Sequence, residues 1–336
     1  MSRTRLLAAV LGGALLLTGT ACGSDDAADG GNGSSGGPKI TAIFSGPTND
    51  ADYNALGLQA LQAAEKDGAR IEYSEKVAVP DVEARLNEAV SDGSTVVWTH
   101  GSQFYDATAK VAAANPDVAF IAEYDGHPDG QPANVWVIDR QFHLGFYAMG
   151  AFAAALSKSG KVGYVGGLSL PFSYAEVHAM QQAVADKGGK ATILPVWTGD
   201  FNDAAKAQQF TTQLLGQGAD VIVGSLNQGA TDTFQAFEGK PADAGFVTAK
   251  YTDKSASAGA HYAGSLIYDF TKPLAEIVGK VKGGTKNGYY PLSFDTGITV
   301  DVSANAPAAA KTAAEEAMTA VKSGKVQVKF DASKIG

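Results

Sequence analysis

Residues 40–67 read ITAIFSGPTNDADYNALGLQALQAAEKD, which holds one strand, one loop and one helix in that order. The apolar, β-branched run at 40–45 predicts a buried strand, and the Ala- and Leu-rich stretch at 53–67 predicts a helix. Gly, Pro, Asn and Asp fill the loop between them, as is common in turns. A strand that feeds directly into a helix is the first half of a βαβ unit, so we expect a parallel sheet.

The same alternation continues along the chain. Further strands are predicted at 70–74, 95–99, 118–122, 135–138, 161–165, 191–195, 221–224, 245–249, 261–267 and 297–302. Further helices are predicted at 81–91, with Asp81 as N-cap, and at 105–114, 142–157, 173–187, 204–217, 230–237, 272–282 and 308–322. Because the pattern restarts after Asp139-Arg140, the expected fold class is α/β with two doubly wound parallel-sheet lobes. A single barrel is the alternative.

Length and composition agree with two packed lobes. A chain of 336 residues exceeds the size at which single cores stop growing. The apolar fraction of 45% and the charged fraction of 18% exclude a wholly disordered chain. A formal net charge of −9 disfavours nucleic acid as a partner. The single cysteine excludes an intramolecular disulfide and a cysteine-rich metal site.

The N-terminus is predicted to be a targeting sequence. Residues 1–22 contain two arginines, an apolar run at 6–17 and small residues that end at Cys22, which is the pattern of a secretory signal. The end of this segment resembles the lipobox of a bacterial lipoprotein, with Gly19 where that pattern prefers Leu. An ordinary signal with a chance Cys is the alternative. Residues 23–38 are expected to be a flexible Gly/Ser/Asp tether, so an extracytoplasmic protein anchored to the cell membrane by a lipidated Cys22 is predicted.

Catalytic and metal-binding motifs are weak in this sequence. It holds no G-x-S-x-G, H-E-x-x-H or P-loop motif, and its histidines lack the i, i+4 spacing of a helical metal pair. His100 and His127 could meet across a cleft or could be ordinary loop histidines. Asp50 and Asp52 are the most enzyme-like feature, because paired carboxylates can bind Ca²⁺ and activate water. No metal, cofactor or catalytic residue is assigned, and a nucleoside hydrolase that uses Asp50 and Asp52 is the alternative.

In open α/β sheets, ligands bind outside the carboxyl ends of the strands. The strand-to-helix loops are therefore the expected binding site. They lie at 45–53, 99–104, 124–126, 166–172, 198–201, 225–229 and 250–253.

Five stretches stand in a characteristic order: GPTNDADYN at 46–54, DATAKVAAANPDVAF at 106–120, GFYAMGAFAAALSKSGKVGYVGG at 145–167, DFNDAAK at 200–206 and QGADVI at 217–222. Together they resemble the basic-membrane-protein family of ABC-transporter substrate-binding lipoproteins, which includes purine-nucleoside and purine-base receptors. The resemblance implies type I periplasmic-binding architecture with a three-strand hinge and crossings near 139–142, 265–269 and 295–299. The implied N-terminal lobe is 39–140 plus 270–296, and the C-terminal lobe is 141–269 plus 297–336.

The resemblance also implies ligand contacts. The family stacks a purine ring between two aromatic side chains, which correspond to Tyr53 and Phe201 here. Its polar pair at the base edge corresponds to Asn49 and Asp50, for which a turn or N-cap role is an equally ordinary reading. Asp253 stands where the family has an acidic residue that faces the ribose or the base.

Two departures from the family pattern bear on the ligand. Tyr251 replaces the first acid of the family's pair, and Lys254 replaces its neighbouring Gln, so the base is better supported than the ribose. Phe104 and Gln228 follow strands of the two halves and complete the predicted contacts. Asp139-Arg140 at the first crossing is predicted either as an ion pair that orients the hinge or as ordinary surface residues.

These features together predict a substrate-binding lipoprotein of an ABC importer. A small planar ligand, a purine base or nucleoside, is expected to bind between the lobes as they close and to pass to a membrane permease. The protein is expected to be a monomer. A surface lipoprotein that acts as a small-molecule sensor is a further alternative.

Overall fold

The computed structural model describes residues 37–335 of the chain. The predicted signal sequence, Cys22 and most of the predicted tether lie outside the described residues. Within residues 37–335, no helix is long and apolar enough to cross a membrane.

A six-stranded parallel sheet forms the first lobe, in the order β11-β5-β4-β3-β1-β2. Its strands are β1 (Lys39–Phe44), β2 (Arg70–Ser74), β3 (Val96–His100), β4 (Ala119–Tyr124), β5 (Val135–Asp139) and β11 (Gly288–Pro291). Successive side chains of a strand serve opposite faces. Ala42 and Phe44 therefore join the core with helices α1 (Tyr53–Lys66) and α9 (Thr271–Lys282), whereas Ile43 joins the core with α2 (Val82–Ser91) and α3 (Tyr105–Ala114).

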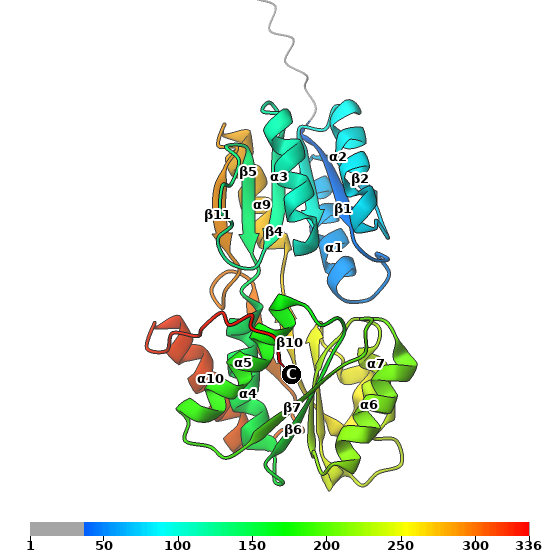
Figure 1. Cartoon of the computed structure of the whole chain (residues 1–336), viewed down its shortest axis with the longest axis vertical. Helices are drawn as coiled ribbons and strands as arrows, with labels where there is room; N and C mark the ends of the chain where they lie inside the picture. Colours follow the sequence, from blue (N-terminus) through cyan, green and yellow to red (C-terminus); the bar gives the residue numbers. More distant parts are fainter. Residues whose placement is uncertain (1–36, 336) are drawn as a thin grey trace, which may run out of the picture. The chain divides into compact units, whose positions relative to one another are not determined.

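The second lobe holds another six-stranded sheet, in the order β12-β10-β9-β8-β6-β7. Its strands are β6 (Lys161–Gly166), β7 (Thr192–Trp197), β8 (Val221–Ser225), β9 (Phe246–Tyr251), β10 (Tyr262–Tyr268) and β12 (Ile298–Val302). Helices α4 (Phe142–Leu156), α5 (Pro171–Asp186) and α10 (Ala308–Lys322) lie on one side of this sheet, and α6 (Ala204–Gly216) and α7 (Ala230–Gln235) lie on the other (Figure 1). The short α8 (Ser255–Ala258) follows β9.

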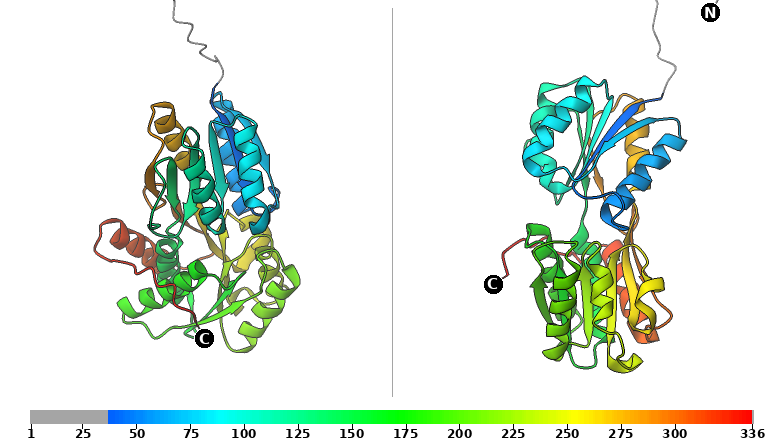
Figure 2. Two further views of the ribbon diagram at one scale, coloured as in Figure 1. Left: turned by 45° about the horizontal axis from the view of Figure 1, so that its top comes forward. Right: turned by 90° about the vertical axis from the view of Figure 1, so that its right-hand side faces the viewer.

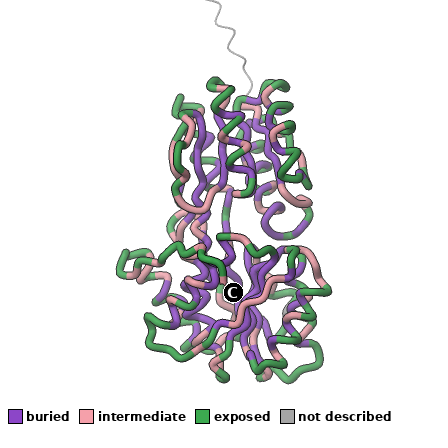
Figure 3. The backbone as a smooth tube through the Cα atoms, viewed as in Figure 1, coloured by how far each residue is buried: buried purple, intermediate pink, exposed green. Residues whose placement is uncertain are grey.

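Three connections join the two sheets (Figure 2). They run from β5 to α4, from β10 to α9 and from β11 to β12. The inner strands of each sheet are buried along most of their length, whereas the edge strands and the outer faces of the helices are more exposed (Figure 3). The prediction of two parallel-sheet α/β lobes is confirmed.

Several local details differ from the predictions, and the short helix α8 is one of the elements that were not predicted. The strand β11 was not predicted, because Gly288 and Pro291 enclose only two tyrosines. A proline is tolerated there because β11 is an edge strand. The strand β12 pairs antiparallel with β10 rather than parallel. Asp81 precedes α2 but makes no side-chain capping bond, and it belongs to a short 3₁₀ turn.

Candidate functional site

A cavity of about 470 Å³ lies at the carboxyl ends of the strands of both lobes. The first lobe contributes residues from the β1–α1 loop, the segment after β3 and the end of β5. The second lobe contributes residues that follow β6, β7 and β8, together with the last residue of β9. This volume is in the usual range for small-molecule sites.

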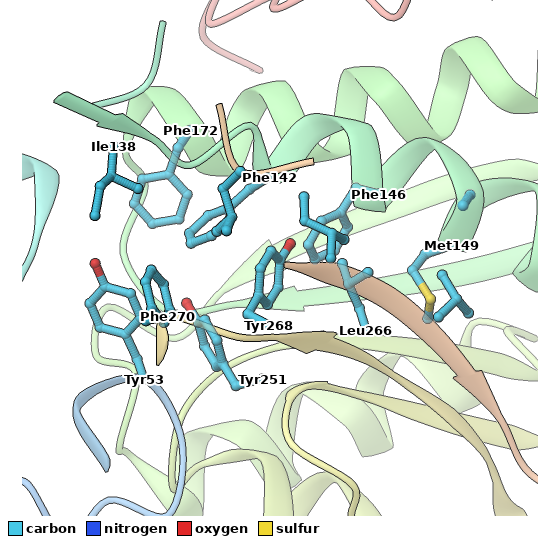
Figure 4. Packing of buried hydrophobic residues seen from close by; sticks show 14 of the residues in the cluster. Tyr53, Ile138, Phe142, Phe146, Met149, Phe172, Tyr251, Leu266, Tyr268 and Phe270 are labelled. Carbon is cyan, nitrogen blue, oxygen red and sulfur yellow. The ribbon is translucent and has the colours of Figure 1, made fainter. Parts of the chain in front are cut away.

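Four aromatic side chains form much of the cavity wall: Tyr53, Phe172, Phe201 and Tyr251. Phe172 and Phe201 lie nearly parallel, at 15°, with ring centroids 6.2 Å apart. The Tyr53 and Tyr251 rings are 5.4 Å apart. Figure 4 shows these two tyrosines clustered on one side, with Phe142 and Phe172 across from them. Flat aromatic walls favour a flat ligand.

Phe201 lies directly against the backbone of Gly167. A Cβ atom added at Gly167 would stand 2.1 Å from Phe201 Cδ1, which is far inside contact distance. The glycine that follows β6 is therefore needed for this ring to occupy its place in the wall.

A buried network holds Tyr53 in position. Its hydroxyl donates to Glu123, and its ring stacks on His100 at 3.9 Å. His100 Nδ1 lies 2.5 Å from Glu123 Oε1, and His100 Nε2 lies 2.7 Å from the Tyr53 carbonyl oxygen. Both ring nitrogens of His100 therefore face oxygen atoms, and these two contacts hold the imidazole ring against Tyr53. Burial, followed by the Glu123 charge, raises the Tyr53 pKa well above its ordinary value.

Arg140 is a buried cation that lines the cavity. Its Nε and Nη2 atoms donate to the Asp125 carboxylate at 2.9 and 2.5 Å, and Nη2 also donates to Ser102 Oγ at 2.7 Å. The guanidinium carbon lies 4.5 Å from the Phe142 ring centroid and 4.9 Å from that of Phe172. Its ion pair is thus with Asp125, whereas the sequence placed a candidate pair with Asp139.

A second buried pair lies beneath the wall of the other lobe. Lys250 Nζ donates to Glu176 Oε1 at 2.6 Å and lies 4.0 Å from the Phe142 ring centroid. Glu176 also accepts from Tyr164 and Ser225. Burial lowers the Lys250 pKa to about 8, against the opposing effect of Glu176.

The β1–α1 loop also meets loops of the second lobe. Asp52 Oδ1 is 2.8 Å from Lys254 Nζ and accepts from Thr252 Oγ1 at 2.9 Å. Both Thr252 and Lys254 also donate to the Ala51 carbonyl oxygen. Burial raises the Asp52 pKa to about 7, although Lys254 and Thr252 lower it.

Two of the predicted contacts, Tyr53 and Phe201, line the cavity. Asp50 instead caps α1: its carboxylate accepts from the backbone N–H groups of Asp52, Asn54 and Ala55. This is the turn and cap role that the sequence left open for it.

The other predicted contacts lie outside the cavity lining. Phe104 is fully buried in the core beside α3. Asn49 is exposed, and its carbonyl oxygen is 3.5 Å from Gln228 Nε2 in the second lobe. The exposed Asp253 accepts from Ser255 and Tyr262, next to α8.

Phe172, Asn227 and Tyr251 line the cavity from loops that the sequence analysis expected to form the site, but they were not singled out as contacts, and Arg140 lies outside those loops. Tyr251 carried one signal, since it departs from the family pattern. Its backbone φ of 77° is unusual for a bulky residue and is typical of strained functional sites. Arg140 was noticed only as a residue of the predicted first crossing between the lobes, where it was interpreted as part of a hinge ion pair or as a surface residue and not as a cavity residue.

The groups that suggested catalysis have other partners. His100 is bound to Glu123, whereas the His127 ring stacks on Tyr289 at 3.7 Å. Among the described residues, no group of three or more His, Cys, Asp or Glu side chains could hold a metal ion.

The sequence of this chain is similar to those of known proteins. Residues 38–302 match the Bmp family, described as ABC transporter substrate-binding protein PnrA-like. Basic membrane protein A2 of Borrelia garinii is 26% identical over 190 residues, which are 56% of this chain and 56% of that protein. A purine-binding protein of Brucella abortus is 26% identical over 190 residues, which are 55% of this chain and 53% of that protein. The chain thus matches about half the length of these curated relatives.

Solved structures share the fold. A solute-binding protein of an ABC transporter system from Conexibacter woesei has a TM-score of 0.68 and 24% identity, covering 88% of this chain and 99% of that one. A solute-binding protein from Aeropyrum pernix has a TM-score of 0.72 and 17% identity, covering 86% of this chain and 92% of that one.

Proposed function

The chain belongs to the Bmp family of PnrA-like ABC-transporter substrate-binding proteins, and from this premise we propose that it captures a small planar ligand of the purine type. The single observation that carries the proposal is a cavity walled by aromatic rings from both lobes, Tyr53 from the first lobe and Phe201 from the second. The purine-binding relative supports the same ligand class.

The chemistry of the wall favours a nucleobase over a sugar or an amino acid. A flat ring gains dispersion and π-face contact against aromatic side chains, at about 1–3 kcal/mol for each stacked base. Tyr53 is suited to this task because the Glu123 bond and the His100 stack fix its ring before a ligand arrives. A wall ordered in advance loses little entropy on binding.

Closure of the two lobes around the ligand would complete the site. Asp52, Thr252 and Lys254 already form hydrogen bonds between loops of the two lobes. Ligand binding and these contacts would favour the same closed arrangement. In our proposal, the closed protein then delivers the ligand to a membrane permease.

The proposed location is extracytoplasmic. We propose that Cys22 is lipidated after signal cleavage and that the Gly/Ser/Asp segment which follows tethers the folded lobes to the cell membrane. Metabolic labelling with a radioactive fatty acid tests this anchor: label should enter the wild type, and a Cys22→Ser variant should remain unlabelled.

A ligand screen tests the binding function. The purified protein is heated with purine bases, purine nucleosides, sugars and amino acids, and each shift in melting temperature is followed by calorimetric titration. A purine at a hundred times its dissociation constant should add about 2.7 kcal/mol of stability. The ligand should be recovered unaltered, which distinguishes a receptor from a nucleoside hydrolase. Binding of a sugar or an amino acid without any purine would overturn the proposal.

A further inference from the structure

Most of the Arg140 side chain is buried and bound to other residues of the protein. The residue is 3% exposed. Its Nε and Nη2 atoms are bound to Asp125 and Ser102, and the guanidinium lies over the rings of Phe142 and Phe172. These contacts fix the plane and the orientation of the group. The one part of it that remains for a ligand is the edge at Nη1.

Nη1 carries two N–H donors and has one weak partner. It lies 3.4 Å from the Tyr53 hydroxyl oxygen, and the Tyr53 proton itself goes to Glu123. Within residues 37–335, the second N–H of Nη1 has no acceptor among the hydrogen bonds of the protein. A buried donor without an acceptor is costly, so this edge of the cavity favours a ligand atom that accepts a hydrogen bond.

The surrounding charges define the kind of acceptor. The Arg140 charge is paired with Asp125, and the Glu123 carboxyl group is hydrogen-bonded to both His100 and Tyr53. The wall therefore offers a directional donor without a surplus of positive charge. Such a donor suits a neutral carbonyl oxygen, since a full negative charge on the ligand would find no unpaired cation there.

We infer that Arg140 is the specificity-determining residue of the cavity and that it selects planar ligands which carry a carbonyl group. This inference rests on the proposed function and deepens it by naming oxopurines as the preferred class. Hypoxanthine has a carbonyl oxygen at the position where adenine has an amino group. In an otherwise equal site, the amino group of adenine would place a hydrogen-bond donor next to the N–H donor of Arg140, so the two groups could not form a hydrogen bond.

The test uses three ligands of nearly equal shape: hypoxanthine, adenine and unsubstituted purine. Calorimetric titration gives their dissociation constants for the wild type and for an Arg140→Met/Asp125→Asn double variant, which removes the donor without leaving a buried carboxylate charge. The wild type should bind hypoxanthine at least tenfold more tightly than adenine, since a factor of ten matches one unsatisfied buried group. In the double variant, this ratio should fall to about one while unsubstituted purine still binds.

Each outcome of the test separates the inference from the proposed function. If no purine binds the wild type, the proposed function fails. If purines bind but the wild type treats adenine and hypoxanthine alike or prefers adenine, the inference about Arg140 alone is wrong. A double variant that keeps the tenfold preference also overturns it. If the double variant does not fold, as judged by circular dichroism, the ratio of the adenine and hypoxanthine dissociation constants of the wild type alone decides whether the inference holds.

Discussion

Phe201 owes its place in the cavity wall to Gly167, so the two residues should behave as a unit. Removing the ring by a Phe201→Ala substitution should weaken purine binding about ten- to a hundredfold, the range for one stacked base. A Gly167→Ala substitution should weaken binding to a similar degree, because its Cβ atom occupies the position of the ring. Calorimetric titration of both variants measures the effect.

A second glycine provides the matched control for this prediction. Gly279 lies in α9, and an added Cβ atom there would meet no atom within 4 Å. A Gly279→Ala variant should bind as the wild type does and be more stable by about 1 kcal/mol, because alanine favours a helix. If Gly167→Ala binds purine as tightly as Gly279→Ala does, Phe201 is not part of the ligand wall.

The sequence allowed Tyr53 and Phe201 to be predicted as residues of the site because both stand in strand-to-helix loops and both match the family pattern. Arg140 could not be assigned in the same way. Its partner Asp125 is 15 positions away, and the two meet only because β4 and β5 are parallel neighbours. The role of Asp50 could not be predicted for a different reason. A carboxylate in a Gly/Pro/Asn/Asp loop can face a ligand or cap a helix, and only the backbone geometry decides between these two roles.

At the scale of elements, the loop after β1 and the loop after β9 form a paired contact between the lobes. A residue with a left-handed backbone lies at each of them: Ala51 in the loop after β1, with a φ of 59°, and Tyr251, the last residue of β9, with a φ of 77°. The Ala51 carbonyl oxygen accepts from Thr252 and Lys254, so the unusual conformation of one loop presents an acceptor to the other. Strain of this kind persists only where neighbouring contacts enforce it.

This contact makes stability depend on pH through Asp52. Burial raises the folded-state pKa of Asp52 to about 7 from an ordinary value of 3.8, so the folded protein holds this proton more tightly than the unfolded chain. The resulting stability is fully present below pH 4 and is lost as the pH rises to about 7. Since each pKa unit corresponds to about 1.4 kcal/mol, the loss is on the order of 4 kcal/mol at most.

Urea unfolding of the wild type and of an Asp52→Asn variant from pH 4 to pH 8 measures this contribution. The difference in unfolding free energy between the two proteins should change across this interval in favour of Asn at the higher pH. An Asp243→Asn variant, altered at an exposed position, should follow the wild type throughout. Parallel pH profiles for the wild type and Asp52→Asn would contradict the assignment.

Most elements could be predicted from the sequence because strand and helix patterns alternate regularly. Among the strands, β11 is the exception and lacks such a pattern: its four residues, Gly288–Pro291, become a strand only because β5 offers them an open edge. The direction of β12 likewise depends on the last crossing between the lobes. Both features belong to tertiary structure rather than to local propensity.

At the scale of the molecule, one hydrophobic cluster runs through both lobes. It contains Tyr53 and Phe270 of the first lobe together with Phe142, Tyr251 and Tyr268 of the second. Several of these residues also border the cavity or support its wall. The core that joins the lobes and the wall that would receive a ligand are therefore one continuous aromatic assembly (Figure 4).

A crystal structure of the protein with hypoxanthine tests the central claim most directly. The account predicts a planar ligand in the cavity between the lobes, in contact with both Tyr53 and Phe201 and with its carbonyl oxygen within hydrogen-bond distance of Arg140 Nη1. A ligand bound outside this cavity, or held by residues of only one lobe, would contradict it.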